Sequence, residues 1–254
     1  MKRLSQVSEA EVIAGFLQNE FYEPDYDSDR GHFDALVTHP DLNNAEHNAL
    51  RRALLYRRRG HMWRELPADT QWWRVQPGPE DIQRLRIFAR AQWLWIGRGD
   101  FRAETIVRRI RTHEYPARVG PFVQKIQRIR GSITCSGNAG PVLLIGKDDA
   151  SPFVILEGNH RVAAALLESY ERFASLNFYC GFSHNMEKCC WYRTNLPSLW
   201  RYLNNRLRNV HDREADVQRL LRETGNPIAP APVTENEVGG SPWKNDSQLL
   251  RARR

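Results

Sequence analysis

The feature that most constrains this chain is the abrupt change of pattern in residues 152–167, which read PFVILEGNHRVAAALL. The apolar run at residues 153–156 predicts a buried strand, and a helical pattern with an apolar face begins almost at once. Such a strand–turn–helix junction points several main-chain N–H groups, and the positive end of a helix dipole, at one spot. The junction therefore predicts an anion site, and phosphate is the anion that we expect there.

The residues at this junction carry the groups that phosphate chemistry requires. Gly158 allows a ligand to approach the main chain closely, and the planar fork of Arg161 suits phosphate oxygens. His160 offers a further hydrogen bond, and Asn159 can both cap the helix and reach the ligand. Glu157 either accepts a proton from an attacking hydroxyl or helps to hold a magnesium ion. The competing interpretation is a purely structural turn in which Glu157 pairs with Arg161 at helical spacing.

The rest of the pattern predicts an α/β (α+β) fold, in which helices wrap a small mixed sheet that follows a helical lobe. Residues 1–70 form that N-terminal lobe, residues 71–224 form the core with its C-terminal helices, and residues 225–254, rich in Pro, Gly, Asn and charge, form a flexible tail. Short apolar runs and helical spacing locate the elements. We expect strands at residues 72–75, 142–145, 153–156 and 176–180, with the middle two as a hairpin, and helices at residues 80–95, 103–112, 122–129, 159–170, 199–207 and 215–223.

The charge balance favours partners that carry phosphate. The chain has 37 Lys and Arg against 30 Asp and Glu, a formal net charge of +7. The arginines cluster at residues 57–59, 108–111 and 128–130, and each cluster is either a basic binding surface or a solvated helix face.

The sequence also predicts the compartment. No apolar run of signal-peptide length follows the first three residues, and none approaches the roughly 20 residues of a membrane span. Four cysteines are too few for a disulfide scaffold in a chain of 254 residues. We therefore expect a cytoplasmic protein with reduced thiols and no membrane partner.

The junction resembles the nucleotide-binding core of the ParB/sulfiredoxin superfamily. There a strand ends in acid-Gly-X-His-Arg, or in Gly-Glu-Arg-Arg, and runs directly into an Ala-rich helix, as Glu157-Gly158-Asn159-His160-Arg161 does here. The resemblance covers residues 141–181. Sulfiredoxins carry a cysteine at the position of Asn159, so the thiol chemistry of sulfinic-acid repair has no nucleophile at this point. The free-serine kinase branch, with Asp-Gly-His-His-Arg, matches more closely, since this chain keeps the acid, the glycine and the His-Arg pair in register.

That resemblance implies a small-molecule kinase, which transfers a phosphoryl group from ATP or ADP, with magnesium, to a hydroxyl of a small metabolite. It assigns catalytic roles to Glu157 and His160 and nucleotide binding to residues 158–161. A second acid from an upstream segment would share the work, and Glu104 and Glu114 are candidates. Two alternatives stay open: a ParB-like nucleic-acid-binding protein or nuclease, and a nucleotide-binding switch or interaction module without fast turnover. The chromosome-partitioning ParB proteins continue into a helix-turn-helix domain, and we find no convincing one after Gly181.

The loop after the strand at residues 176–180 offers possible substrate contacts. Ser183, His184 and Asn185 directly follow this strand, where they could line the pocket of the acceptor. Tryptophans such as Trp63 and Trp93, interleaved with arginine, either stack on bases of single-stranded nucleic acid or pack in the core.

A second group of residues has the side-chain types of a zinc site. Cys180, His184, Cys189 and Cys190 supply thiols and an imidazole, but their spacing is not a standard one and adjacent cysteines chelate one ion awkwardly. Buried thiols are the competing interpretation.

Overall fold

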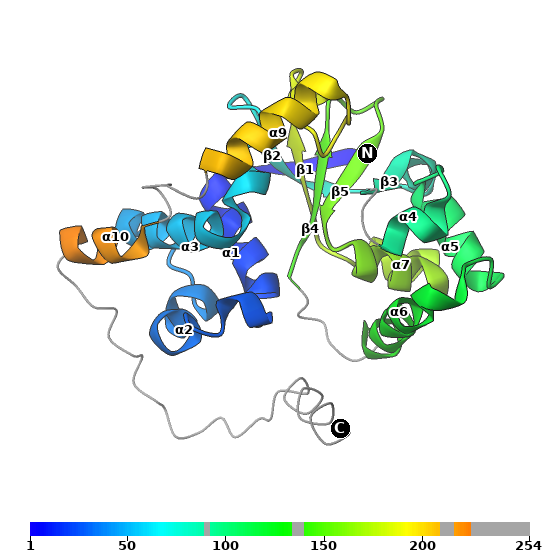
Figure 1. Cartoon of the computed structure of the whole chain (residues 1–254), viewed down its shortest axis with the longest axis horizontal. Coiled ribbons are helices and arrows are strands. Elements are labelled where there is room, and N and C mark those ends of the chain that lie inside the picture. Colours follow the sequence, from blue (N-terminus) through cyan, green and yellow to red (C-terminus); the bar gives the residue numbers. More distant parts are fainter. Residues whose placement is uncertain (89–91, 134–139, 209–215, 225–254) are drawn as a thin grey trace.

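The structure is a computed structural model, and it describes residues 1–88, 92–133, 140–208 and 216–224. In these residues a six-stranded mixed sheet lies between two groups of helices (Figure 1). The strands follow the order β1-β2-β6-β4-β5-β3 across the sheet. The expected fold class, an α/β arrangement of a small mixed sheet wrapped by helices, is confirmed. The segment 225–254, expected to be a flexible tail, lies outside the described residues.

The elements have the following bounds. The strands are β1 (Lys2–Val7), β2 (Gln71–Gln76), β3 (Leu85–Ile87), β4 (Val142–Gly146), β5 (Phe153–Glu157) and β6 (Phe178–Phe182). The α-helices are α1 (Glu9–Glu20), α2 (Arg30–Thr38), α3 (Ala45–Trp63), α4 (Gln92–Gly97), α5 (Ala103–Arg111), α6 (Gly120–Ile133), α7 (Asn159–Glu168), α8 (Tyr170–Ala174), α9 (Leu196–Arg208) and α10 (Val217–Thr224). None of these helices is long and apolar enough to cross a membrane.

The predicted hairpin is confirmed as part of the sheet. β4 and β5 pair antiparallel, with Leu144 opposite Ile155. Asp148 holds their turn, because its Oδ1 accepts hydrogen bonds from the main-chain N–H groups of Ala150 (2.9 Å) and Ser151 (2.7 Å). β6 lies parallel to β4, and β3 lies parallel to β5. The hairpin strands are therefore paired on both edges, inside the sheet.

Each face of the sheet carries its own hydrophobic core. On one face, Val154 and Leu156 of β5 pack in a cluster with helices α1–α3, including Phe16 of α1. On the other face, Phe153 and Ile155 pack in a cluster with helices α4–α7. Successive side chains of a strand point to opposite faces, so a strand covered on both faces needs an unbroken apolar run. The helices that we assigned to an N-terminal lobe thus cover one face of the sheet (Figure 1).

Short polar side chains set the starts of several helices. Ser8 before α1, Asn44 before α3 and Ser169 before α8 each accept a hydrogen bond from a main-chain N–H in the first turn of the helix. Ser169 has extended main-chain angles (φ −161°, ψ 168°), so the expected helix at residues 159–170 is divided into α7 and α8.

Two stretches differ from the sequence-based expectation. Residues 2–7, expected within a helical segment, form the edge strand β1. Its side chains are mostly exposed, so no alternation of apolar residues marks it. Where one helix was expected at residues 80–95, the described residues form the short 3-10 helix Pro79–Arg84, strand β3 and the start of α4, and residues 89–91 lie outside them. Main-chain pairing of β3 with β5 outweighs the helical spacing of the apolar residues there.

Candidate functional site

The candidate site is built on the turn between β5 and α7. Gly158 has φ 95° and ψ 16°, a left-handed conformation that residues with a side chain rarely adopt. A Cβ atom at this position would lie 3.0 Å from Cγ2 of Val142 and 3.2 Å from Nη2 of Arg161. The turn therefore favours glycine for its main-chain conformation, and a Cβ there would also be tightly packed.

Helix α7 begins without a side-chain cap. Its N-cap residue is Gly158, whereas the N-cap residues of α1 and α3 are Ser8 and Asn44, whose side chains cap these helices. The first N–H groups of any helix have no acceptor within the helix. At α7 the main-chain oxygen of Gly158 accepts from the N–H of Val162 (2.9 Å), but Gly158 has no side chain to cap the first turn, where the helix dipole favours a negatively charged group.

Arg161 lies mostly buried beside the turn, with 14% of its side chain exposed. Its guanidinium donates hydrogen bonds to the main-chain oxygens of Gly140 and Pro141, the latter at 3.0 Å. Nη2 also lies 3.9 Å from Oε1 of Glu157. Burial lowers the pKa of Arg161, and the carboxylates of Glu157 and Glu20 oppose that shift. Arg161 thus holds the chain that enters β4, a contact that sequence reasoning did not predict.

His160 and Asn159 have contrasting surroundings. The His160 ring lies among aromatic side chains, with its centroid 5.4 Å from that of Trp93 in α4 and 4.9 Å from that of Phe122 in α6. Oδ1 of Asn159 is buried and has no hydrogen-bond partner among the described residues. A buried amide oxygen without a donor costs free energy.

The end of α1 reaches the same place. Nδ2 of Asn19 donates a 3.0 Å hydrogen bond to the main-chain oxygen of Pro141, the oxygen that Arg161 also contacts. Burial lowers the pKa of Arg161, and the charge of Glu20, the next residue, partly opposes that shift; Glu20 also forms a 2.9 Å ion pair with Arg59. Sequence reasoning missed Asn19 and Glu20, because no local pattern links the end of the first helix to a turn so far along the chain.

The two acids considered from sequence as partners of Glu157 have other surroundings. Glu104 is exposed in the first turn of α5, and Glu114 accepts a 2.7 Å hydrogen bond from Oγ1 of Thr112. No hydrogen bond or ion pair of the described residues joins either acid to the turn. Glu20, in contrast, acts electrostatically on Arg161.

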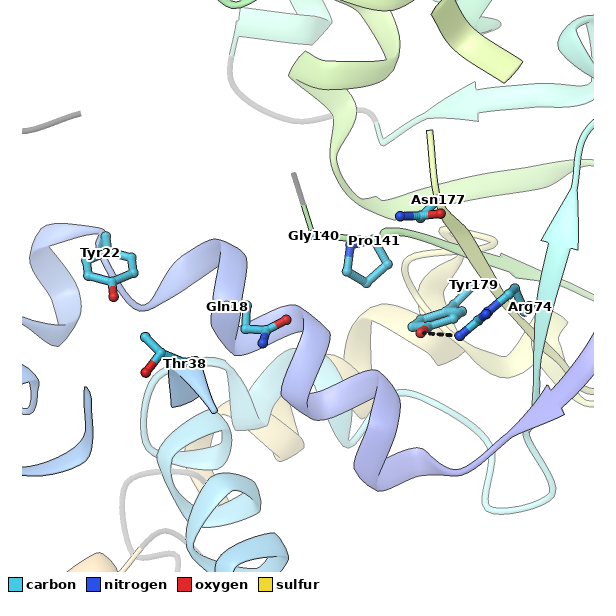
Figure 2. Close-up of a pocket in the computed structure, with 8 residues that line it drawn as sticks. All are labelled: Gln18, Tyr22, Thr38, Arg74, Gly140, Pro141, Asn177 and Tyr179. Atoms are coloured by element: carbon cyan, nitrogen blue, oxygen red, sulfur yellow. Dashed lines mark hydrogen bonds between the residues drawn. The ribbon is translucent and has the colours of Figure 1, made fainter. Parts of the chain in front are cut away.

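A cavity of about 470 Å³ borders the segment that Arg161 holds (Figure 2). Gly140 and Pro141 form part of its wall, between α1 and the sheet. Most of the other lining side chains are polar, so the cavity suits a polar ligand. They are Gln18, Tyr22, Thr38, Arg74, Asn177 and Tyr179.

Glu11 of α1 fixes the two sheet residues of this cavity. Tyr179 and Arg74 lie opposite each other on β6 and β2 (Figure 2). The Tyr179 hydroxyl donates a 2.7 Å hydrogen bond to Oε1 of Glu11, and Nη2 of Arg74 donates one of 3.1 Å to the same oxygen. Burial, followed by the hydrogen bond to Glu11, raises the pKa of Tyr179. Glu11 thus holds two groups in place on the cavity wall, the neutral phenol of Tyr179 and the guanidinium of Arg74.

The structure does not bring Ser183, His184 and Asn185 to the turn. They follow the last residue of β6, which pairs with the last residue of β4. Glu157, in contrast, pairs with Leu143 near the start of β4, at the other end of that strand. At that far end, Oγ of Ser183 donates a 2.7 Å hydrogen bond to Asp69 and Nδ2 of Asn185 donates one of 3.1 Å. These hydrogen bonds lower the pKa of Asp69. The predicted substrate contacts therefore lie at the opposite end of the sheet.

The zinc interpretation finds no support. Cys180, Cys189 and Cys190 are free, buried thiols. Burial raises the pKa of Cys189 to about 12 and that of Cys180 well above its usual value. Within the part of the chain that the structure describes, which includes His184, no three His, Cys, Asp or Glu side chains converge as a metal site.

Several residues that could bind nucleic acid are used inside the fold. Trp63 and Trp72 stack with ring centroids 5.8 Å apart, and both are buried, as is Trp93. Arg57 forms a 2.6 Å ion pair with Asp29, in the first of the arginine clusters. The neighbouring Arg59 pairs with two acids, and Arg109 of the second cluster donates to main-chain oxygens at the end of α4. These arginines are therefore committed to contacts within the fold.

No family model, curated protein or solved structure matches this chain.

Proposed function

We propose that this protein is a nucleotide-dependent phosphotransferase related to the ParB/sulfiredoxin superfamily. The β5–α7 turn binds the phosphates of ATP or ADP, and a hydroxyl of a small metabolite accepts the phosphoryl group. One observation carries the proposal: the uncapped start of α7, the carboxylate of Glu157 and the guanidinium of Arg161 meet around one glycine, Gly158. Main-chain N–H groups and fixed charges of this kind position phosphates, and phosphoryl transfer depends mainly on such positioning.

The main-chain N–H groups of α7 are the proposed phosphate ligands. Arg161 has donors committed to Gly140 and Pro141, so its main contribution is to fix that segment and to place a positive charge behind the turn. His160 packs on the aromatic residues of α4 and α6, which orients the first turn of α7. In this division of work the phosphates contact the main chain at residues 158–161.

Two carboxylates supply the acid–base chemistry. Glu157 is partly exposed at the end of β5, with 26% of its side chain accessible, and Glu20 replaces Glu104 and Glu114 as the proposed second acid. One of them accepts the proton of the attacking hydroxyl. Carboxylates repel a nearby polyphosphate. Glu157 would hold a magnesium ion, whose positive charge would offset this repulsion.

The cavity beside Gly140 and Pro141 is the proposed acceptor site. It borders the segment that Arg161 fixes, and its polar wall, with Arg74 held by Glu11, suits a small polar metabolite better than an apolar one. For direct, in-line transfer the acceptor hydroxyl would have to reach past this segment to the phosphates at the turn.

Incubation of the full-length protein with γ-labelled ATP and magnesium tests the proposal, with amino acids, sugars and oligonucleotides as the panel of acceptors. Labelling of a small hydroxyl compound supports it. Stoichiometric nucleotide binding without any product would indicate a switch instead. Oligonucleotide binding that falls steeply with salt, together with little affinity for free nucleotide, would indicate a nucleic-acid protein.

Substitution of the acids gives a sharper test. Of Glu157→Gln and Glu20→Gln, the variant that removes the general base should keep the thermal stabilisation by ATP but lower the rate of transfer by about 100-fold or more. Glu104→Gln is the matched control and should stay active. A fully active Glu157→Gln variant would remove this residue from the mechanism.

A further inference from the structure

Helix α9 is amphipathic in the opposite sense to an ordinary surface helix. Its buried residues are the polar Ser198 and Asn205. Its outer face carries large apolar side chains, among which Leu196 is 83% exposed and Trp200 is 68% exposed. A surface helix normally buries its apolar side and exposes its polar side. The arrangement of α9 leaves an apolar surface for which the described residues supply no cover.

Polar contacts on the inner face prevent α9 from rotating its apolar side inward. Nδ2 of Asn205 donates a 2.6 Å hydrogen bond to Oε1 of Glu65, whose side chain is buried just after α3. Nη2 of Arg201 donates one of 3.1 Å to the main-chain oxygen of Glu65. The ring of Tyr202 packs edge-on against Trp191 at a centroid distance of 5.5 Å. The outward direction of the apolar face is therefore built into the fold.

The exposed residues have the spacing of a helix–helix seam. We call Leu196, Trp200, Leu203 and Leu207 the α9 stripe. They are separated by four, three and four residues, which is the alternation by which one helix packs along another. Exposed apolar surface that is continuous in this way marks an interaction site more often than isolated apolar residues do.

The charges beside the α9 stripe indicate the kind of helix that fits. Residues 196–208 contain three arginines, Arg201, Arg206 and Arg208, and no Asp or Glu. The whole chain also carries a formal net charge of +7. A second copy of α9 would bring like charges together, whereas an acidic helix would place carboxylates beside these arginines.

We propose that the α9 stripe docks an acidic amphipathic helix of a partner protein. The partner's apolar seam packs on the stripe, with Trp200 near its centre, and its flanking carboxylates lie beside Arg206 and Arg208. This interaction surface belongs to α9 and is separate from the β5–α7 turn, so it stands or falls independently of the proposed phosphotransferase activity.

Two synthetic helical peptides test the inference with the full-length protein. Both carry leucine seams with the same spacing, one flanked by Glu and the other by Lys, and fluorescence anisotropy measures their binding. The Glu peptide should bind and the Lys peptide should not, and added salt should weaken the binding. Trp200→Ser and Leu203→Ser should each lower the affinity for the Glu peptide by about tenfold or more, because apolar and aromatic residues at the centre of an interface carry much of its affinity.

Leu94→Ser in α4 is the matched control, since Leu94 is 48% exposed and Leu203 is 50% exposed. It should leave peptide binding unchanged, and circular dichroism should show all three variants folded. Equal binding of the two peptides, or no binding of either, would overturn the proposal. Two other results would also overturn it. One is a homodimer that Trp200→Ser abolishes and that the Glu peptide does not disrupt. The other is adsorption to anionic phospholipid vesicles that Trp200→Ser abolishes and with which the Glu peptide does not compete.

Discussion

Asn19 and Arg161 donate hydrogen bonds of 3.0 Å to the same main-chain oxygen, that of Pro141. Asn19 lies in the last turn of α1, which covers one face of the sheet, and Arg161 lies in the first turn of α7, which covers the other. The two layers therefore meet at the segment that enters β4. This shared acceptor also connects the turn at Gly158 to the cavity, because Pro141 forms part of the cavity wall.

Replacement of Arg161 should affect both stability and ligand binding. Arg161→Ala removes the donors to Gly140 and Pro141, and we expect the free energy of unfolding in urea to fall by about 2 kcal/mol. The variant should also lose its thermal stabilisation by ATP. Arg128→Ala, at an exposed position of α6, is the control and should change neither quantity. Unchanged stabilisation by ATP in folded Arg161→Ala would count against the nucleotide site.

Two glycine substitutions should change stability in opposite directions. Gly158→Ala forces a side chain into left-handed main-chain angles and against Val142, so we expect a loss of about 1–2 kcal/mol. Gly131→Ala lies in helix α6 with no atom within 4 Å of the new Cβ, so we expect a gain of about 0.5–1 kcal/mol. Thermal and urea unfolding measure both. A Gly158→Ala variant as stable as the parent chain would show that the turn adopts other angles.

The stability of the folded chain in acid should depend on Asp100. Hydrogen bonds from the side chain and main chain of Arg102, and from Thr105, hold the pKa of Asp100 well below its usual range. A lowered pKa in the folded state gives stability that is present above the ordinary Asp pKa of about 3.9 and is lost as the pH falls below it. Asp100→Asn should therefore flatten the fall of the melting temperature between about pH 5 and pH 2. An equally steep fall in the variant would contradict this assignment.

Elements with a strong local pattern were predicted from the sequence, whereas strands that depend on pairing with a distant strand were not. The hairpin and α7 follow from apolar runs and helical spacing within residues 142–168, and both are present. Strand β1 was missed because its exposed side chains carry no period, and β3 because only its pairing with β5 makes it a strand. The loop at Ser183 was expected near the turn, but the direction of β6 places it at the other end of the sheet.

The sequence by itself determined the strand–turn–helix junction around Gly158, because apolar runs and helical periodicity depend on neighbouring residues. Only the tertiary structure decided which groups surround that turn. Arg161 faces the oxygens of Gly140 and Pro141, Glu20 lies near enough to shift its pKa, and α1 closes a cavity against the sheet. These contacts join residues far apart in the chain, so they depend on how whole helices and strands pack and not on any local pattern.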